Sequence, residues 1–158
     1  MQNGITLVAY AKEDSLCGTL SAHLYTDKDR NSYGYIEYLA VEPSQKRTGI
    51  GEKLFSEMER ILLSKGVSYI MSDTAARAKS SVKWHRKRGF VIVGYHSYKS
   101  TNYYSYIFRK QYSSPSIWNS NLYSSMRFVL SYLKTVLERN KNGDERFLYG
   151  KLKQLLVK

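Results

Sequence analysis

The segment Lys46-Arg47-Thr48-Gly49-Ile50-Gly51 is a basic loop with two glycines, and its setting predicts the fold on either side of it. Residues 33–41, which precede it, are apolar and aromatic and predict a strand; Pro43 ends that strand because proline has no amide to donate to a sheet. Residues 50–65, which follow it, carry apolar side chains at helical spacing. A helix N-terminus presents unpaired amides, and glycine lets the backbone approach an anion closely. The segment therefore predicts a phosphate-binding loop.

The same patterns predict the elements around this loop. Residues 5–12 and 16–26 alternate in polarity and form the two strands of an expected hairpin. Downstream we expect a strand at 67–71, a helix at 80–88 and two strands at 90–98 and 103–109. The resulting order, β-β-β-α-β-α-β-β, is typical of an α/β domain.

A helical extension is expected after the Ser/Pro-rich residues 113–116. Its first helix has one apolar face, made by Trp118, Leu122, Met126, Val129, Leu130, Leu133, Val136 and Leu137. Asp144 is expected to cap a last helix. We therefore expect a domain over residues 1–111 and a basic amphipathic helical extension over residues 112–158. Because so long an apolar face is rarely left in water, we expect it to pack on the domain or across a homodimer.

Composition and charge narrow the functional classes. The chain has 158 residues, no apolar run long enough to cross a bilayer and a single cysteine, which predicts a cytoplasmic protein without a membrane or disulfide framework. The net charge of +12 fits a solubilising surface, an anionic cofactor, an anionic partner or nucleic acid. The 15 tyrosines are expected mostly as half-buried strand residues.

Three stretches together resemble the GNAT acetyltransferase superfamily. They are the strand at residues 35–43, the basic Gly-x-Gly loop, and the helix end Lys87-Arg88-Gly89-Phe90. The resemblance covers about residues 5–110. It implies a mixed, mostly antiparallel, splayed sheet flanked by helices. It also implies an N-acetyltransferase that moves an acetyl group from acetyl-CoA to an amine acceptor and needs no metal.

The resemblance implies which residues bind acetyl-CoA. The pyrophosphate is expected on the loop amides and the pantetheine arm on the exposed strand backbone, where it lies like an added strand. The cofactor-binding residues expected on this basis are Leu39, Ala40, Val41, Lys46, Arg47, Thr48, Gly49, Ile50 and Gly51.

Two residues are predicted to move protons. Glu37 is the expected base, acting on the acceptor amine through a water, because strand alternation would place it on one face with Tyr35, Leu39 and Val41. His85 stands where the family often carries a tyrosine acid and is the expected proton donor to the CoA sulfur. Other candidates for the acid are Tyr95, Tyr98, Tyr103 and Tyr104.

The sequence departs from the family pattern at several places. Lys46 replaces the usual first residue of the loop, and Ala78 replaces an asparagine before the second helix. The helices that usually precede the strand at Ile5 and wall the acceptor pocket have too few residues here. The C-terminal helices or a partner are expected in that space.

The acceptor and two other functional classes stay open. A small amine, an amino-acid derivative, an antibiotic, a protein N-terminus and a lysine all fit the pattern. The main alternative is a non-catalytic acyl-CoA-binding or protein-interaction module, and the third class is a basic nucleic-acid-binding protein.

Overall fold

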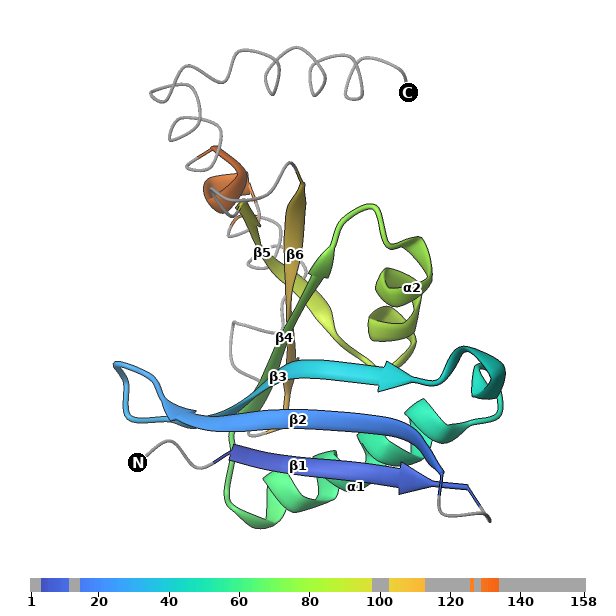
Figure 1. The fold of residues 1–158 in the computed structure, drawn as a ribbon. Helices are drawn as coiled ribbons and strands as arrows, with labels where there is room; N and C mark the ends of the chain where they lie inside the picture. Colours follow the sequence, from blue (N-terminus) through green and yellow to red (C-terminus); the bar gives the residue numbers. More distant parts are fainter. Residues whose placement is uncertain (1–3, 12–14, 98–102, 113–125, 127–128, 134–158) are drawn as a thin grey trace. The chain divides into compact units, whose positions relative to one another are not determined.

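The computed structural model describes residues 4–11, 15–97, 103–112, 126 and 129–133. The strands are β1 (Gly4–Tyr10), β2 (Leu16–Thr26), β3 (Ser32–Val41), β4 (Tyr69–Ala75), β5 (Val91–Ser97) and β6 (Tyr104–Gln111). The helices are α1 (Ile50–Ser64), α2 (Lys79–Lys87) and a short 3-10 turn at Pro43–Gln45 (Figure 1). The element order predicted for the first 111 residues is confirmed. The helix predicted after Asp144 lies outside the described residues.

The strands form one mixed sheet in the order β1-β2-β3-β4-β6-β5. β2 pairs antiparallel with both β1 and β3, whereas β3 and β4 run parallel. The parallel pair follows from the chain path, because α1 crosses over between the two strands. The predicted fold class, a mixed open sheet flanked by helices, is confirmed.

The chain divides into two compact units. The first contains residues 1–73 and 109–114, and the second contains residues 74–108 and 115–158. The division runs through β4 and β6. The boundary expected after residue 111 stays a prediction.

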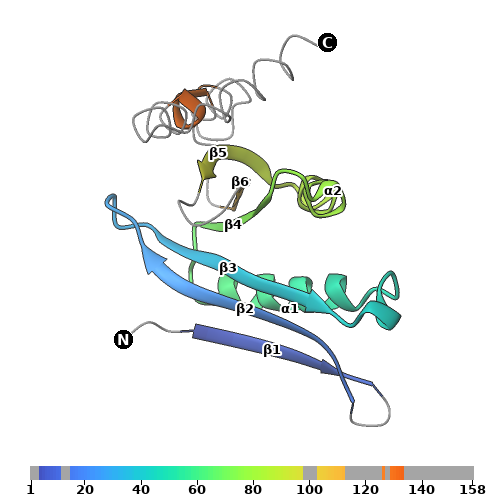
Figure 2. The ribbon, with the colours of Figure 1, turned by 45° about the horizontal axis from the view of Figure 1, so that its top comes forward.

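In the first unit, α1 covers one face of β1–β3 (Figures 1 and 2). Its buried side chains are Leu54, Phe55, Met58 and Leu62, at the spacing that predicted the helix. Gly34 lets the helix lie close to β3, because a β-carbon there would lie 2.7 Å from Leu62 Cδ1. On β2, Leu20 and Ala22 are fully buried. This face of the sheet is therefore the core of the unit.

Tyrosines gather on the other face of the first unit. The rings of Tyr33 and Tyr69 stack with their centroids 4.9 Å apart, and Tyr25 stacks on Tyr33 at 5.5 Å. The Arg109 guanidinium lies 3.7 Å from the centre of the Tyr69 ring. Each such contact adds about 0.5–1.5 kcal/mol beyond the burial of area. The expectation of half-buried strand tyrosines is confirmed for Tyr25 and Tyr33.

We expect low pH to destabilise the fold at the loop between β2 and β3, through protonation of Asp27. Burial raises the pKa of the Asp27 carboxyl, but hydrogen bonds from Asn31, Tyr69 and Asp29 outweigh it and leave that pKa below its usual value. The charged form therefore stabilises the fold above about pH 4, and this contribution is lost as the pH falls through the lowered folded-state pKa. Urea unfolding between about pH 5 and 2.5 should show a steeper loss in the wild type than in Asp27→Asn. Equal slopes would contradict the prediction.

The second unit has an aromatic core between α2 and β6. Phe108 is fully buried, and Phe90 and His85 are 3% and 6% exposed. The His85 and Phe108 rings stack with their centroids 4.4 Å apart. These contacts join the end of α2 to β6, so the helix is held by side-chain packing.

The described part of the C-terminal extension touches β5 through two residues. The Tyr95 amide donates to the Ser131 hydroxyl at 2.7 Å, and the Tyr132 ring lies 5.4 Å from the Tyr95 ring. The apolar residues Met126, Val129, Leu130 and Leu133 are all exposed. Packing of the apolar face on the domain stays a prediction, because most of that face lies outside the described residues. Its burial across a dimer stays a prediction. No helix in the described part of the chain is both long and apolar enough to span a bilayer.

Candidate active site

The basic loop has a backbone that can cradle an anion. Arg47 and Gly49 both have positive φ angles, 68° and 90°, and α1 begins immediately after Gly49. The Thr48 hydroxyl donates to the Gln45 carbonyl at 2.7 Å, which fixes the turn. No side chain caps the helix, so its first amides stay available to a ligand. Alternating left-handed residues of this kind turn successive amides toward one point.

The space and charge around the loop fit a phosphate group. Nothing lies within 4 Å of the position a β-carbon would take at Gly49. At Gly51 a β-carbon would lie 3.5 Å from Val41 Cγ2, so the loop stands beside the end of β3. Lys46 and Arg47 are exposed and bring positive charge, while Glu52 in the first turn of α1 opposes it. The residues present therefore fit the pyrophosphate of CoA.

β3 and β4 separate directly before this site. Their parallel pairing runs from Tyr33↔Tyr69 to Ile36↔Ser72, and the printed register extends no further among the described residues. Residues 38–41 thus keep their β2 partners on one side, while the printed register gives them no partner on the side toward β4. An extended ligand arm can add to a free strand edge of this kind. This is the edge on which Leu39, Ala40 and Val41 are predicted to bind the pantetheine arm.

A β-bulge in β3 lies at Glu37. Ser21 pairs with Tyr38, and the next residue of β2, Ala22, pairs with Ile36, so Glu37 is the extra residue. A bulge reverses the alternation of side chains along a strand. Leu39 pairs with the buried Leu20 and therefore shares the α1 face, together with Val41. The expectation that Glu37 and Tyr35 share a face with Leu39 and Val41 is wrong for that reason.

The Glu37 side chain lies on the face opposite α1. Its Oε1 is 3.6 Å from Nδ1 of His23, and the two side chains are 44% and 28% exposed. His23 pairs across the strands with Tyr35, which places the carboxylate on the Tyr35 side of the bulge. The following residue, Tyr38, is 56% exposed. A ligand on this face can therefore reach Glu37.

Asp73 is a candidate site residue that the sequence pattern did not reveal. It lies one step beyond Ser72, the last residue of β4 that pairs with β3, and accepts a hydrogen bond from the Tyr35 hydroxyl at 2.7 Å. The strand predicted from the apolar run at residues 67–71 stops short of it. β4 continues to Ala75, and Ser72 is buried. The signal that could have placed Asp73 is the alternation of Met71, Asp73 and Ala75 on one face of the longer strand.

His85 belongs to the second unit and is part of its core. Its Nδ1 lies 2.8 Å from the Ser81 carbonyl, and a carbonyl only accepts, so Nδ1 carries the proton. The rings of Trp84, Phe90 and Phe108 surround the imidazole at 5.0, 5.3 and 4.4 Å. The Nδ1 proton is thus engaged within α2. Glu37 belongs to the first unit, so the structure places the two predicted proton carriers in different units.

The tyrosines offered as alternative acids lie in different settings. Burial raises the pKa of Tyr95 well above its usual range, with the neighbouring Tyr104 adding to the shift. Burial also raises the pKa of Tyr104, so both hydroxyls are protonated at neutral pH. Tyr103 lies under the Arg77 guanidinium, 5.0 Å from its ring centre. Tyr98 lies outside the described residues.

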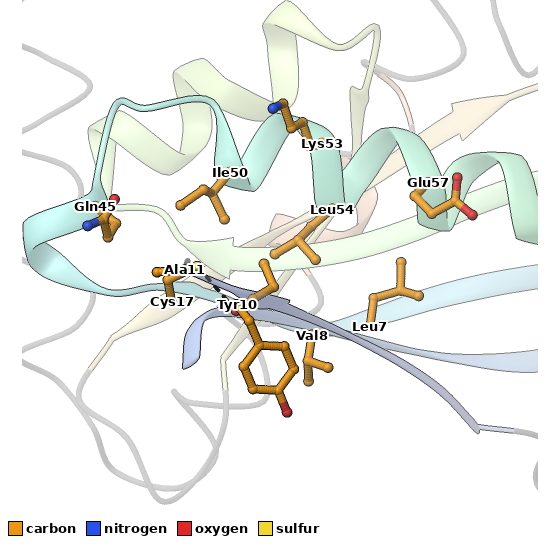
Figure 3. A pocket seen from close by; sticks show the side chains of 11 residues that line it. Leu7, Val8, Tyr10, Ala11, Cys17, Gln45, Ile50, Lys53, Leu54 and Glu57 are labelled. Atoms are coloured by element: carbon orange, nitrogen blue, oxygen red, sulfur yellow. Dashed lines mark hydrogen bonds between the residues drawn. The ribbon is translucent and has the colours of Figure 1, made fainter. Parts of the chain in front are cut away.

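A cavity of about 360 Å³ lies between β1 and the first turns of α1 (Figure 3). Leu7, Ile50 and Leu54 line it with apolar side chains, and Lys53 and Glu57 stand above it on α1. Cys17 is also in the lining and donates its thiol hydrogen to the Ala9 carbonyl. None of the residues predicted to move protons lines this cavity.

Comparison with known proteins gives one family match and many structural matches. A family model described as the acetyltransferase (GNAT) family matches residues 1–90. No curated protein sequence matches the chain. The described ranges hold no group of three His, Cys, Asp or Glu side chains able to bind a metal ion.

Solved structures share the fold at low identity. An acetyltransferase from Bacillus cereus ATCC 14579 is 22% identical, with 70% of this chain and 74% of that chain covered and a TM-score of 0.59. Arabidopsis thaliana Naa50, solved with the bisubstrate analogue CoA-Ac-MVNAL, is 20% identical over 68% and 72% of the two chains, with a TM-score of 0.60. A streptothricin acetyltransferase from Bacillus anthracis str. Ames, named as putative and solved with acetyl coenzyme A, is 22% identical over 70% and 64%, with a TM-score of 0.60.

Proposed function

Because the chain belongs to the GNAT acetyltransferase family, we propose that it transfers an acetyl group from acetyl-CoA to an amine. The observation that carries the proposal is that the first unit contains both a loop suited to phosphates and a free strand edge beside it. The open, left-handed Gly49 loop offers amides to phosphates, and the edge of β3 beyond Ile36 offers backbone to an extended ligand arm. A nucleic-acid-binding protein would need the positive charge but neither of these features.

Acetyl-CoA supplies an activated thioester, and the residues of this chain supply position and a base. The amides of residues 47–51 hold the pyrophosphate, and residues 39–41 hold the pantetheine arm. Glu37 accepts a proton from the acceptor amine, directly or through a water, because an alkyl ammonium with a pKa of about 10.4 is protonated at neutral pH. The second proton, released when the amide forms, goes to the departing sulfur.

The contacts of His85 favour a structural role in the second unit over a role in proton transfer. Its role as the acid stays a prediction, and its contacts favour packing, because its Nδ1 proton is held by Ser81 within α2. A thiol with an ordinary pKa of about 8.5 leaves tolerably as the thiolate. Solvent is therefore sufficient as the proton source for the sulfur.

An assay can decide the class of the acceptor amine. Similar solved structures include a putative streptothricin acetyltransferase and Naa50 with the bisubstrate analogue CoA-Ac-MVNAL, so antibiotics and peptide N-termini belong in the test. Release of CoA from acetyl-CoA would be measured with a panel of aminoglycoside-type and streptothricin-type antibiotics, amino acids, polyamines, short peptides and lysine peptides. Binding of acetyl-CoA without acetylation of any member would favour the non-catalytic acyl-CoA-binding module.

We expect Gly49→Val to abolish most of the affinity for acetyl-CoA. Valine fills the open space at Gly49 and resists the φ of 90°, so the loop amides can no longer approach a phosphate closely. Titration calorimetry on the folded variant should show at least a tenfold weaker affinity. Gly66→Val is the matched control, because Gly66 has a φ of 76° with equally open space but stands at the other end of α1.

Both variants should lose similar stability, about 1–2 kcal/mol, from the left-handed conformation. Only Gly49→Val should lose binding. Equal affinities in the two variants would mean that the loop is an ordinary helix entry.

A further inference from the structure

We propose that His23 positions the general base, holding the Glu37 carboxylate through its Nδ1–H. The inference rests on the proposed function, in which Glu37 accepts the acceptor's proton. His23 acts through Glu37 and does not contact the substrate itself. The contact with His23 would orient the Glu37 carboxylate, which stands on a bulge where regular sheet pairing is lost.

The first observation is the contact itself. Nδ1 of His23 lies 3.6 Å from Oε1 of Glu37, slightly beyond hydrogen-bond distance. Contacts of catalytic groups are often long in the free enzyme and shorten when substrate is bound. Rotation of the carboxylate alone can close this gap, because Glu37 is half exposed.

The second observation is that His23 Nδ1 has no competing partner. The atom is buried, and within the described residues it makes no hydrogen bond. A buried nitrogen of this kind costs free energy unless a partner is near. Glu37 is the acidic group placed to satisfy it, so the proton is expected on Nδ1, where it points toward the carboxylate.

The third observation concerns the space around the imidazole. His23 pairs with Gly4 on β1 and with Tyr35 on β3. A β-carbon at Gly4 would lie 2.8 Å from Nε2 and 3.1 Å from Cδ2 of His23. Glycine at this position therefore leaves room for the ring to lie over β1, and the Tyr25 ring stands 6.3 Å away on the same strand. The ring therefore lies against Gly4 of β1 and near Tyr25 of its own strand.

The proton balance needs no further reactant. The acceptor ammonium gives one proton to Glu37 before the amine attacks the thioester carbon. The C–N bond forms, the C–S bond breaks, and the second nitrogen proton goes to the sulfur. Throughout, His23 keeps its Nδ1 proton and donates to Glu37, as the third group of a catalytic set orients the base.

Nitrogen-15 NMR of the imidazoles tests the contact without any activity. The chain has three histidines, and His85, whose Nδ1–H faces the Ser81 carbonyl, is an internal reference for the Nδ1–H tautomer. At about pH 8.5, where imidazoles are neutral, His23 should show the Nδ1–H tautomer in the wild-type chain. In Glu37→Gln it should move toward the Nε2–H tautomer while His85 stays unchanged. An Nε2–H tautomer in the wild type would overturn the proposal.

Three substitutions at His23 test the role in turnover. His23→Asn places an amide donor near the position of Nδ1 and should keep most of the wild-type kcat. His23→Gln places it near Nε2, and His23→Leu removes it, so both should lower kcat by about 10- to 100-fold with KM for acetyl-CoA unchanged; this is the loss seen when partners that orient metal-binding histidines are removed. The assay uses the panel amine with the highest rate or, if none reacts, hydrolysis of acetyl-CoA. Equal rates for His23→Leu and the wild type would overturn the role.

Gly4→Ala is a variant that removes no group of the site. Its added methyl displaces the His23 ring and should lower kcat in part, whereas Thr6→Ala, on the same face of β1, should not. A failed acceptor assay would count against the proposed function alone, because the NMR result decides the His23–Glu37 contact independently. A loss of kcat in Thr6→Ala equal to that in Gly4→Ala would show a general effect of β1 and overturn the positioning role.

Discussion

Glu37→Gln should lower turnover by about 10²–10⁴-fold and leave acetyl-CoA affinity unchanged. Glutamine keeps the size of the side chain at the bulge but cannot accept the acceptor's proton. The carboxylate is 44% exposed and lies away from the loop that is proposed to hold the phosphates. The substitution should therefore impair proton transfer without impairing the binding of acetyl-CoA. The measurements are kcat with the best amine of the panel, its pH profile and the calorimetric affinity. The acidic limb of the profile, which reports the base, should disappear.

Glu57→Gln is the matched control for this change. Glu57 is also a half-exposed glutamate, but it lies on α1 in an ion pair with Arg60. The same loss of one negative charge there should leave kcat within about twofold, since exposed ion pairs on a surface contribute little. Full turnover in Glu37→Gln would exclude Glu37 as the base, and Asp73, hydrogen-bonded to Tyr35, would be the next carboxylate to replace.

Phe108→Ala should lower the free energy of unfolding by about 3–5 kcal/mol. Phe108 is fully buried and stacks on His85, so its removal leaves a cavity at the junction of α2 and β6. Urea unfolding followed by tyrosine and tryptophan fluorescence measures the change. Tyr10→Ala, at a 61% exposed position on β1, is the control and should change stability by less than about 0.5 kcal/mol. A loss below about 1 kcal/mol in Phe108→Ala would mean that the second unit repacks.

Local sequence patterns predicted the elements of the first 111 residues because their signals are strong. The apolar spacing of α1, the glycine after it and the alternation in β2 each act over a few residues. The predictions failed where a residue outside the segment decides the outcome. β4 was predicted to end at residue 71, yet it extends to Ala75, because pairing in a sheet supports polar residues that no local pattern marks.

The site was predicted less completely than the fold. The loop at residues 46–51 could be found because glycines and basic residues before a helix have a direct physical meaning. The face of the sheet on which the Glu37 side chain lies was predicted from regular alternation along the strand. That alternation holds only if the pairing of the two strands contains no extra residue. His23 and Asp73 are distant in sequence from Glu37 and His85 and carry no motif, so only the sheet register brings them to the site.

The bulge at Glu37 also changes how β3 can vary over evolution. Before it, the positions that must stay small or apolar are Gly34 and Ile36; after it, they are Leu39 and Val41, so the phase of constraint reverses within one strand. Loss of the whole residue would leave Leu39 and Val41 facing α1, because Leu39 pairs with Leu20 and Val41 with Gly18, and Glu37 takes no part in either pair. In descendants of this chain, a β3 shorter by this one residue is therefore expected to keep its packing on α1, so retention of the bulge would reflect the use of the carboxylate and not the needs of the core.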